Sequence, residues 1–181
     1  MRISNLVLIE ELKLLTLKAI ESATQLSKEP LEKLQKKENP TTWSALECIE
    51  HLNRYGDFYL PEIKAVMLPD KQSAIEIFKA GLLGNYFANA MKVKPKLNKM
   101  KTFQNMNPNQ CSLNKDVLVV FLKQQAEMLD LLNQAKTYNL TKLKTKISIS
   151  KFIKLRLGDT FRVVVYHNER HLLQANRYFF S

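Results

Sequence analysis

The sequence predicts an all-α protein, a four-helix bundle with a long crossover between its second and third helices. Four long segments repeat apolar residues with the period of a helix that buries one face. Glycine and proline are scarce, at 4 and 6 in 181 residues, whereas a protein of many short strands needs frequent turn formers. A long stretch between the second and third helical segments matches bundles with a crossover connection.

The first two helices are expected at residues 3–27 and 43–67. Pro30 and the segment "KKENP" (36–40) end the first helix and mark a loop. Ser44 is followed three residues later by Glu47, the spacing of a capping box at the start of the second helix.

The second helix and the connection that follows it depart from a regular bundle. The second helix has two candidate positions for a bend, near Gly56 or near Pro61. Residues 73–91 show a short helical period that two glycines make irregular, and residues 92–111 have no period and form a connecting loop. We expect 73–111 to shape the mouth of any site in the bundle.

The third and fourth helices are expected at residues 114–136 and 160–178. Between them, "KLKTKISIS" (142–150) alternates apolar and polar residues and predicts a brief extended segment. Asp159 is the expected N-cap of the fourth helix. The length and the absence of an internal repeat predict one domain over residues 1–181.

The charge of the chain is strongly basic, at +11 with an isoelectric point near 9.6. The two lysine-rich segments, 91–101 and 141–154, do not alternate lysine with aromatic residues as a single-strand binding groove does. We therefore expect a solvated surface that attracts anions weakly, and no nucleic-acid site.

Cysteine use and hydropathy predict a reduced, cytoplasmic protein without a membrane partner. Cys48 and Cys111 form no CxxC motif and no disulfide framework. The apolar start of the chain is interrupted by Glu10, Glu11 and Lys13, unlike a signal peptide. No apolar stretch approaches the ~18 residues that span a membrane.

The three histidines form the strongest functional pattern. His167 and His171 are four residues apart, which places both imidazoles on one face of a helix and suits two ligands of one metal ion. His51 lies in the middle of the second helix, and bundles build metal sites from facing helices. Three nitrogen ligands would leave a coordination position open for a reactant. The alternative is that these are core histidines bonded to carbonyl or carboxylate groups, since periodicity alone does not bring His51 to the pair.

Two longer motifs resemble those of the DinB-like superfamily, which includes YfiT-type bacillithiol transferases and mycothiol-dependent enzymes. They are "WSALECIEHL" (43–52) and "LGDTFRVVVYHNERHLLQ" (157–174). The shared pattern is a Trp-Ser opening, a glutamate four residues before a histidine, and a late H-x-x-x-H-x-x-Gln. The resemblance covers nearly the whole chain, except residues 73–111.

This resemblance implies a four-helix bundle that holds a divalent metal ion, zinc or nickel, through His51, His167 and His171. It also implies a small-molecule substrate, a low-molecular-weight thiol as cosubstrate, and a homodimer. A metal ion bound by neutral imidazoles favours the deprotonated form of either a thiol or water. The sequence leaves open a thiol transferase, a metal-dependent hydrolase, and a non-enzymatic helical binding or stress protein.

Glu47 is the candidate catalytic carboxylate, because it lies one turn before His51. It could orient that imidazole or act as a base. The alternative is a glutamate that stabilises the first helical turn together with Ser44.

Three residues of the fourth helix are candidates for supporting roles. Asn168 and Gln174 could hydrogen-bond to the metal ligands or simply line the bundle seam, and Arg170 could attract an anionic thiol or be an ordinary surface residue. Cys48 and Trp43 are expected to pack in the core and at the end of the bundle.

Overall fold

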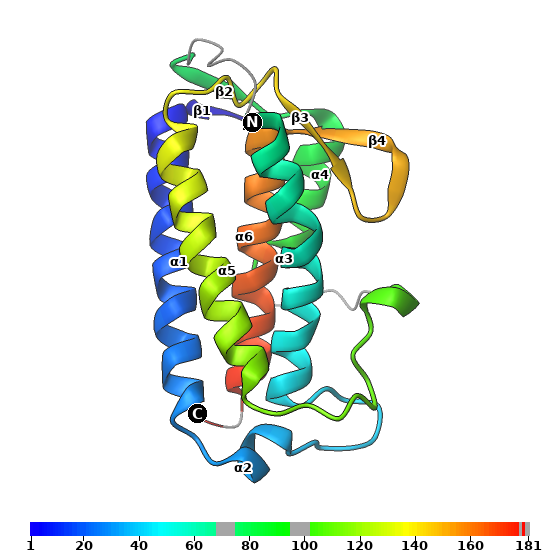
Figure 1. The fold of residues 1–181 in the computed structure, drawn as a ribbon. Coiled ribbons are helices and arrows are strands. Elements are labelled where there is room, and N and C mark those ends of the chain that lie inside the picture. Colours follow the sequence, from blue (N-terminus) through cyan, green and yellow to red (C-terminus); the bar gives the residue numbers. More distant parts are fainter. Residues whose placement is uncertain (68–74, 95–101, 178, 180–181) are drawn as a thin grey trace.

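The computed structural model describes residues 1–67, 75–94, 102–177 and 179, and its fold is mostly helical (Figure 1). The predicted all-α bundle with a long crossover is confirmed. Its four long helices are α1 (Asn5–Ser27), α3 (Ala45–Met67), α5 (Asp116–Ala135) and α6 (Leu157–Asn176). The predictions for residues 68–74, 95–101 and 178 lie outside the described residues. None of the described helices is long and apolar enough to pass through a lipid bilayer.

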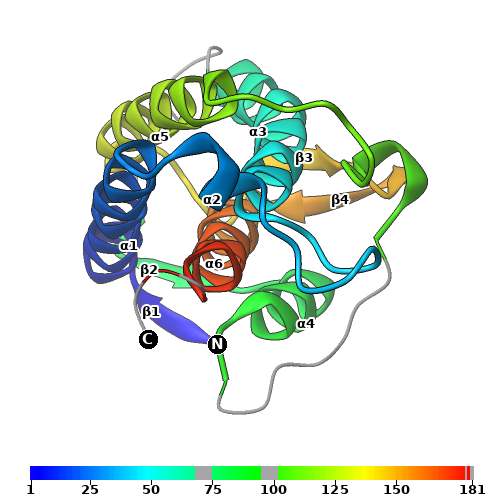
Figure 2. The same ribbon diagram turned by 90° about the horizontal axis from the view of Figure 1, so that it is seen from below.

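The helices form a ring in which α1 and α3 each contact both α5 and α6. Figure 2 views the bundle along the helix axes and shows α4 (Leu82–Met91) outside this ring, beside α6. α3 and α5 run in the same direction in Figure 1, so the chain must return along the bundle between them. That return is the long crossover, and it carries β2 (Ile77–Lys79), α4 and the 3-10 helix η1 (Gln104–Met106).

The apolar core consists of two clusters that follow one another along the bundle. On α3, the first includes Leu52 and the second includes Tyr59. On α6, the corresponding members are Leu172 and Val164. On α6, His167 and His171 lie between Tyr166 of the second cluster and Leu172 of the first, whereas His51 on α3 lies within the first, between Ile49 and Leu52. Apolar packing therefore fixes the helix segments that carry the histidines.

Short strands connect segments that lie far apart in the sequence. β1 (Arg2–Ser4) pairs antiparallel with β2, so the first helix begins at Asn5 rather than at residue 3. The predicted extended segment contains β3 (Lys144–Ile147), which pairs with β4 (Ser150–Arg156). A short helix, α2 (Leu31–Gln35), occupies part of the first loop.

The start of α6 differs from the prediction. The N-cap is Arg156, so the expectation that Asp159 caps the helix is wrong. The N–H groups of Leu157 and Gly158 donate to the backbone carbonyls of Leu143 and Leu140, which removes the need for a side-chain cap. The Asp159 carboxylate lies inside the first turn and accepts from Arg162 at 3.0 Å.

α3 continues as one helix through Gly56 and Pro61. A Cβ atom at Gly56 would lie 2.0 Å from Oε1 of Gln124 on α5, so glycine permits the close approach of these two helices.

Candidate metal centre

The bundle brings the three histidines together between α3 and α6. One ring nitrogen of each lies within 4.8 Å of the others. Nε2 of His51 is 3.3 Å from Nε2 of His167. Two nitrogens that each bind a tetrahedral zinc ion at about 2.0–2.1 Å lie about 3.4 Å apart, so this pair already has a suitable separation.

Hydrogen bonds on the far side of the His51 and His171 rings select the tautomers that metal binding requires. Nδ1 of His51 lies 2.7 Å from the carbonyl oxygen of Met106, which can only accept, so Nδ1 donates and Nε2 keeps its lone pair. Nδ1 of His171 likewise donates to Oε1 of Gln174 at 3.0 Å. Such outer partners are typical of metal-binding histidines because they fix both ring orientation and tautomer.

Burial keeps these imidazoles neutral. It lowers the pKa of His51 to about 4 and the pKa of His171 to about 3. The pKa of His167 falls well below its usual value, first through burial and then through the neighbouring His171 and His51. Neutral imidazole is the form that binds metal ions.

The donor set therefore fits a divalent ion. Among the residues with described positions, no carboxylate or thiol joins the three nitrogens. Three neutral nitrogen donors suit a divalent ion such as zinc, nickel, copper or iron and leave room for a further ligand, unlike the closed set of a structural zinc site.

A cavity of about 870 Å³ gives access to the histidines. Trp43 and Tyr55 flank them: the Trp43 ring centroid is 4.6 Å from that of His51, and the Tyr55 centroid is 4.7 Å from that of His167. Trp43 is thus part of the cavity wall as well as a packing residue. The sequence analysis expected Trp43 to be a packing residue at the end of the bundle and gave Tyr55 no role. The position of Tyr55, four residues after His51 on the same helix face, could have indicated that it lies beside the site.

Elements outside the bundle form the rest of the cavity wall. Phe87 and Met91 come from α4, Phe103 from the segment before η1, and Ile147 and Leu155 from the β3–β4 hairpin. Described residues between 73 and 111 therefore do line the mouth of the site.

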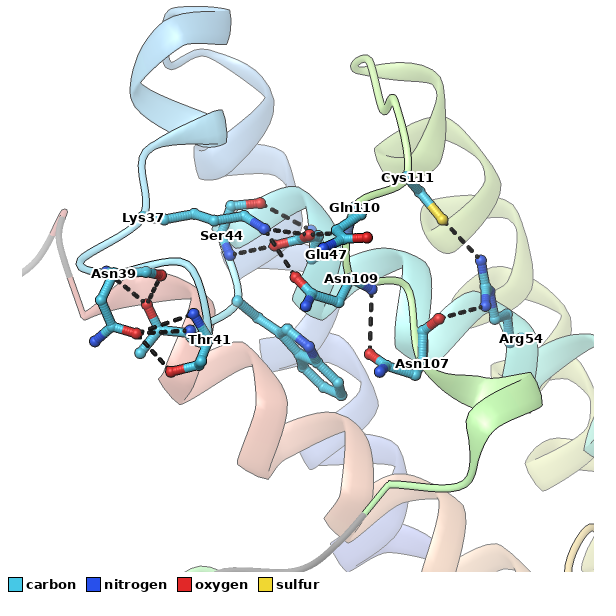
Figure 3. Close-up of polar contacts among 12 residues, drawn as sticks. Lys37, Asn39, Thr41, Ser44, Glu47, Arg54, Asn107, Asn109, Gln110 and Cys111 are labelled. Carbon is cyan, nitrogen blue, oxygen red and sulfur yellow. Dashed lines mark hydrogen bonds and ion pairs between the residues drawn. The ribbon is translucent and has the colours of Figure 1, made fainter.

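Arg54 holds the η1 segment against α3. Its Nη1 atom donates to the carbonyl of Asn107 at 3.0 Å, and its Nη2 atom lies 3.4 Å from Sγ of Cys111 (Figure 3). The same segment presents the Met106 carbonyl to His51. Arg54 thus connects a surface loop to the orientation of a candidate ligand.

The carboxylate of Glu47 accepts hydrogen bonds from residues outside the histidine group (Figure 3). Its Oε2 accepts from the backbone of Ser44 at 2.8 Å, and its own N–H donates to Oγ of Ser44 at 3.2 Å, which is the predicted capping box. Its Oε1 accepts from Lys37 at 2.6 Å and from the backbone of Gln110 at 3.2 Å. The structure does not bring this carboxylate into the histidine group.

The other candidate residues divide between the cavity and the core. Gln174 reaches His171, and Arg170 lines the cavity, where burial lowers its pKa. Asn168 points away from the histidines and donates to Gln125 on α5 at 2.9 Å. Cys48 packs in the core, where burial raises its pKa to about 12.

Comparison with known protein families gives a match over most of the chain. The model of a family described as the DinB superfamily matches residues 15–175. This range includes both histidine-bearing helices and the crossover between α3 and α5. No curated protein and no solved structure matches the chain significantly.

Proposed function

Because the chain belongs to the DinB superfamily, we propose that it is a metal-dependent enzyme that holds a divalent ion, zinc or nickel, through His51, His167 and His171. The observation that carries this proposal is the convergence of three neutral imidazoles on one wall of a cavity. Buried histidines satisfied only by carbonyls would not need three ring nitrogens to face one another.

We further propose that the reaction transfers a low-molecular-weight thiol to a small electrophile. A divalent ion in the site would supply the positive charge that favours a thiolate over a thiol. The thiol releases its proton to water, its sulfur forms a bond to carbon, and the leaving group departs from that carbon as an anion with the bonding electrons. A cavity of about 870 Å³ has room for both reactants.

The residues around the histidines have defined tasks in this proposal. Met106 and Gln174 keep the imidazoles oriented through their oxygen atoms. Arg170 attracts the anionic part of a thiol cosubstrate, since it lines the same cavity. Glu47 stabilises the helix start and the η1 segment rather than acting as a base.

Metal analysis tests the first part. Protein purified without a histidine tag should contain or take up about one zinc or nickel ion per chain, and His171→Ala should lose this binding. Leu173→Ala, at an exposed position of the same helix, is the matched control. A content below about a tenth of an equivalent, with no uptake of either ion, would exclude the metal site.

A kinetic screen tests the second part. Low-molecular-weight thiols are combined with chlorodinitrobenzene, and turnover by the metal-loaded protein is compared with turnover by the His171→Ala variant. Turnover that requires the histidine supports thiol transfer. Metal-dependent ester hydrolysis without thiol transfer would favour a hydrolase, and neither activity would favour a non-enzymatic binding protein.

We also propose a cytoplasmic homodimer. Cys48 and Cys111 are both free thiols, which suits a reducing compartment. Leu6, Leu14 and Leu17 form an exposed apolar stripe along α1, which a partner copy could cover. Light scattering should give the mass of a dimer, and Leu14→Asp should shift it towards the monomer.

A further inference from the structure

The cavity beside the histidines has an apolar and aromatic wall. Tyr55 and Tyr59 stack with centroids 6.2 Å apart and an angle of 13° between their planes. Tyr59 also accepts from the backbone N–H of Ser148 at 3.3 Å, so the β3–β4 hairpin is held against this aromatic surface. Trp43 lies beside the histidines on the same wall. Flat rings arranged in this way favour an aromatic ligand, which can stack on them.

Two apolar wall residues remain in contact with solvent. Phe103 is 51% exposed and Ile149 is 43% exposed, although both line the cavity. Apolar side chains that stay accessible around a large concave site mark a place where a ligand covers them.

The charges on the wall are of one sign. Among its described lining residues, none is acidic and Arg170 is the one charged residue. A cationic ligand would lose its hydration and meet only positive charge, whereas a neutral or anionic ligand would not.

We propose that the acceptor substrate of this site is an aromatic compound that is neutral or anionic, bound against Tyr55, Tyr59 and Trp43. This inference rests on the proposed function in that it calls the ligand the acceptor of the thiol. The preference for a neutral or anionic aromatic ligand is a property of the cavity itself. It can therefore be measured without metal and without turnover.

The chain provides its own probe, because Trp43 is its sole tryptophan and lines the cavity. Quenching of its fluorescence is followed in chelator-treated protein with para-nitrobenzyl alcohol, para-nitrobenzoate and para-nitrobenzylammonium. These compounds share one ring and differ in charge. We expect the alcohol and the benzoate to bind, and the ammonium to bind at least about tenfold more weakly. Cyclohexylmethanol should compete with the alcohol less effectively than benzyl alcohol does.

Two matched variants locate the binding. Ile149→Asp and Val119→Asp each place a carboxylate at an exposed apolar position, but only Ile149 lines the cavity. Ile149→Asp should weaken benzoate binding about tenfold, and Val119→Asp should leave it unchanged. Phe103→Asp is a second wall variant that does not disturb the core, since Phe103 is half exposed.

Three results would overturn the inference: no quenching by any probe, equal binding of the ammonium and the alcohol, or benzoate binding that neither wall variant weakens. Metal titration of the same protein separates this failure from failure of the proposed function. Metal uptake without probe binding removes the aromatic acceptor alone. Probe binding without metal uptake leaves an aromatic-binding cavity and removes the enzyme proposal.

Discussion

The Nδ1 atom of His51 donates its hydrogen to the carbonyl of Met106, and this single bond decides which nitrogen can meet a metal ion. His171 is held in the same way by Gln174. Residues 167 and 171 share a helix face by spacing alone, and Gln174 lies only three residues after His171, whereas the Met106 partner of His51 is brought to it by the fold. The chemistry of the site at this scale is therefore set by oxygen atoms that are not themselves ligands.

Acid should destabilise the metal-free protein through these histidines. Burial lowers the pKa of His51 to about 4 and that of His171 to about 3, while an unfolded histidine titrates near 6.5. Below about pH 6.5 the unfolded chain therefore binds more protons than the folded one. Stability is complete above this pH and falls as the pH drops towards 4, by at most about 1.4 kcal/mol per pH unit for each histidine.

Urea unfolding in the presence of a chelator, between about pH 7 and about pH 5, measures this slope. His171→Asn should unfold with a shallower pH dependence than the parent protein. Parallel profiles for the two proteins would show that His171 is not buried in its neutral form.

Arg54 should influence metal affinity without touching the metal. Arg54→Gln removes the guanidinium that holds the η1 segment at Asn107, so the Met106 carbonyl loses its fixed position beside His51. We expect zinc affinity to fall about 10–100-fold, the range for lost outer partners of metal ligands. Competition with a chromophoric chelator measures this, with Arg2→Gln, at the exposed first residue of β1, as control. Unchanged affinity would mean that the loop does not orient His51.

At the scale of elements, the start of α3 is stabilised by residues close together in the sequence, whereas the start of α6 is stabilised by residues further away. The capping box of α3 is local, because Ser44 and Glu47 are three residues apart, and the sequence predicts it correctly. At the start of α6, the backbone N–H groups of Leu157 and Gly158 donate to carbonyl oxygens of Leu143 and Leu140, more than ten residues earlier in the chain. The sequence instead indicated Asp159, because a cap formed by backbone atoms has no signature in side-chain identity.

Glu47→Gln should separate a structural role from a catalytic one. The substitution removes the charge that pairs with Lys37 at 2.6 Å and weakens the capping box. We expect a loss of roughly 1–2 kcal/mol in the free energy of unfolding, with zinc affinity changed less than about threefold. Denaturant unfolding and zinc titration measure both quantities, and Ser44→Ala should give a similar loss of stability. If the Glu47→Gln variant binds zinc and is stable but has no turnover, Glu47 acts as a base.

At the scale of the whole molecule, the histidines bring α3 and α6 together beside two apolar clusters. A ligand that binds only the folded state stabilises all of it. Zinc at about a hundred times its dissociation constant should add about 2.7 kcal/mol, which corresponds to a rise of roughly 5–10 °C in the melting temperature of a chain of this size. Scanning calorimetry with and without zinc measures the shift. His171→Ala should show none, and an equal shift in that variant would place the bound ion elsewhere.

The net charge of +11 also acts on the molecule as a whole. Some of its cations face each other, as Lys146 and Lys154 do across the β3–β4 hairpin, and Lys146 lies 3.5 Å from Glu62. We expect this basic surface to be solvated and not to bind nucleic acid, because the two lysine-rich segments of the sequence do not alternate lysine with aromatic residues. A DNA titration at about 50 mM salt should detect no binding.

The sequence by itself determined the four helices, the capping box and the shared face of His167 and His171, because each depends on residues within a few positions of one another. Only the tertiary structure decided that His51 meets His167, 116 positions away, and takes a carbonyl 55 positions away as its partner. It also gave the Glu47 carboxylate Lys37 and the backbone of Gln110 as further partners, and put Trp43 and the β3–β4 hairpin on the cavity wall. Helical periodicity states which face a side chain occupies, but the path of the chain through the crossover determines what that face meets.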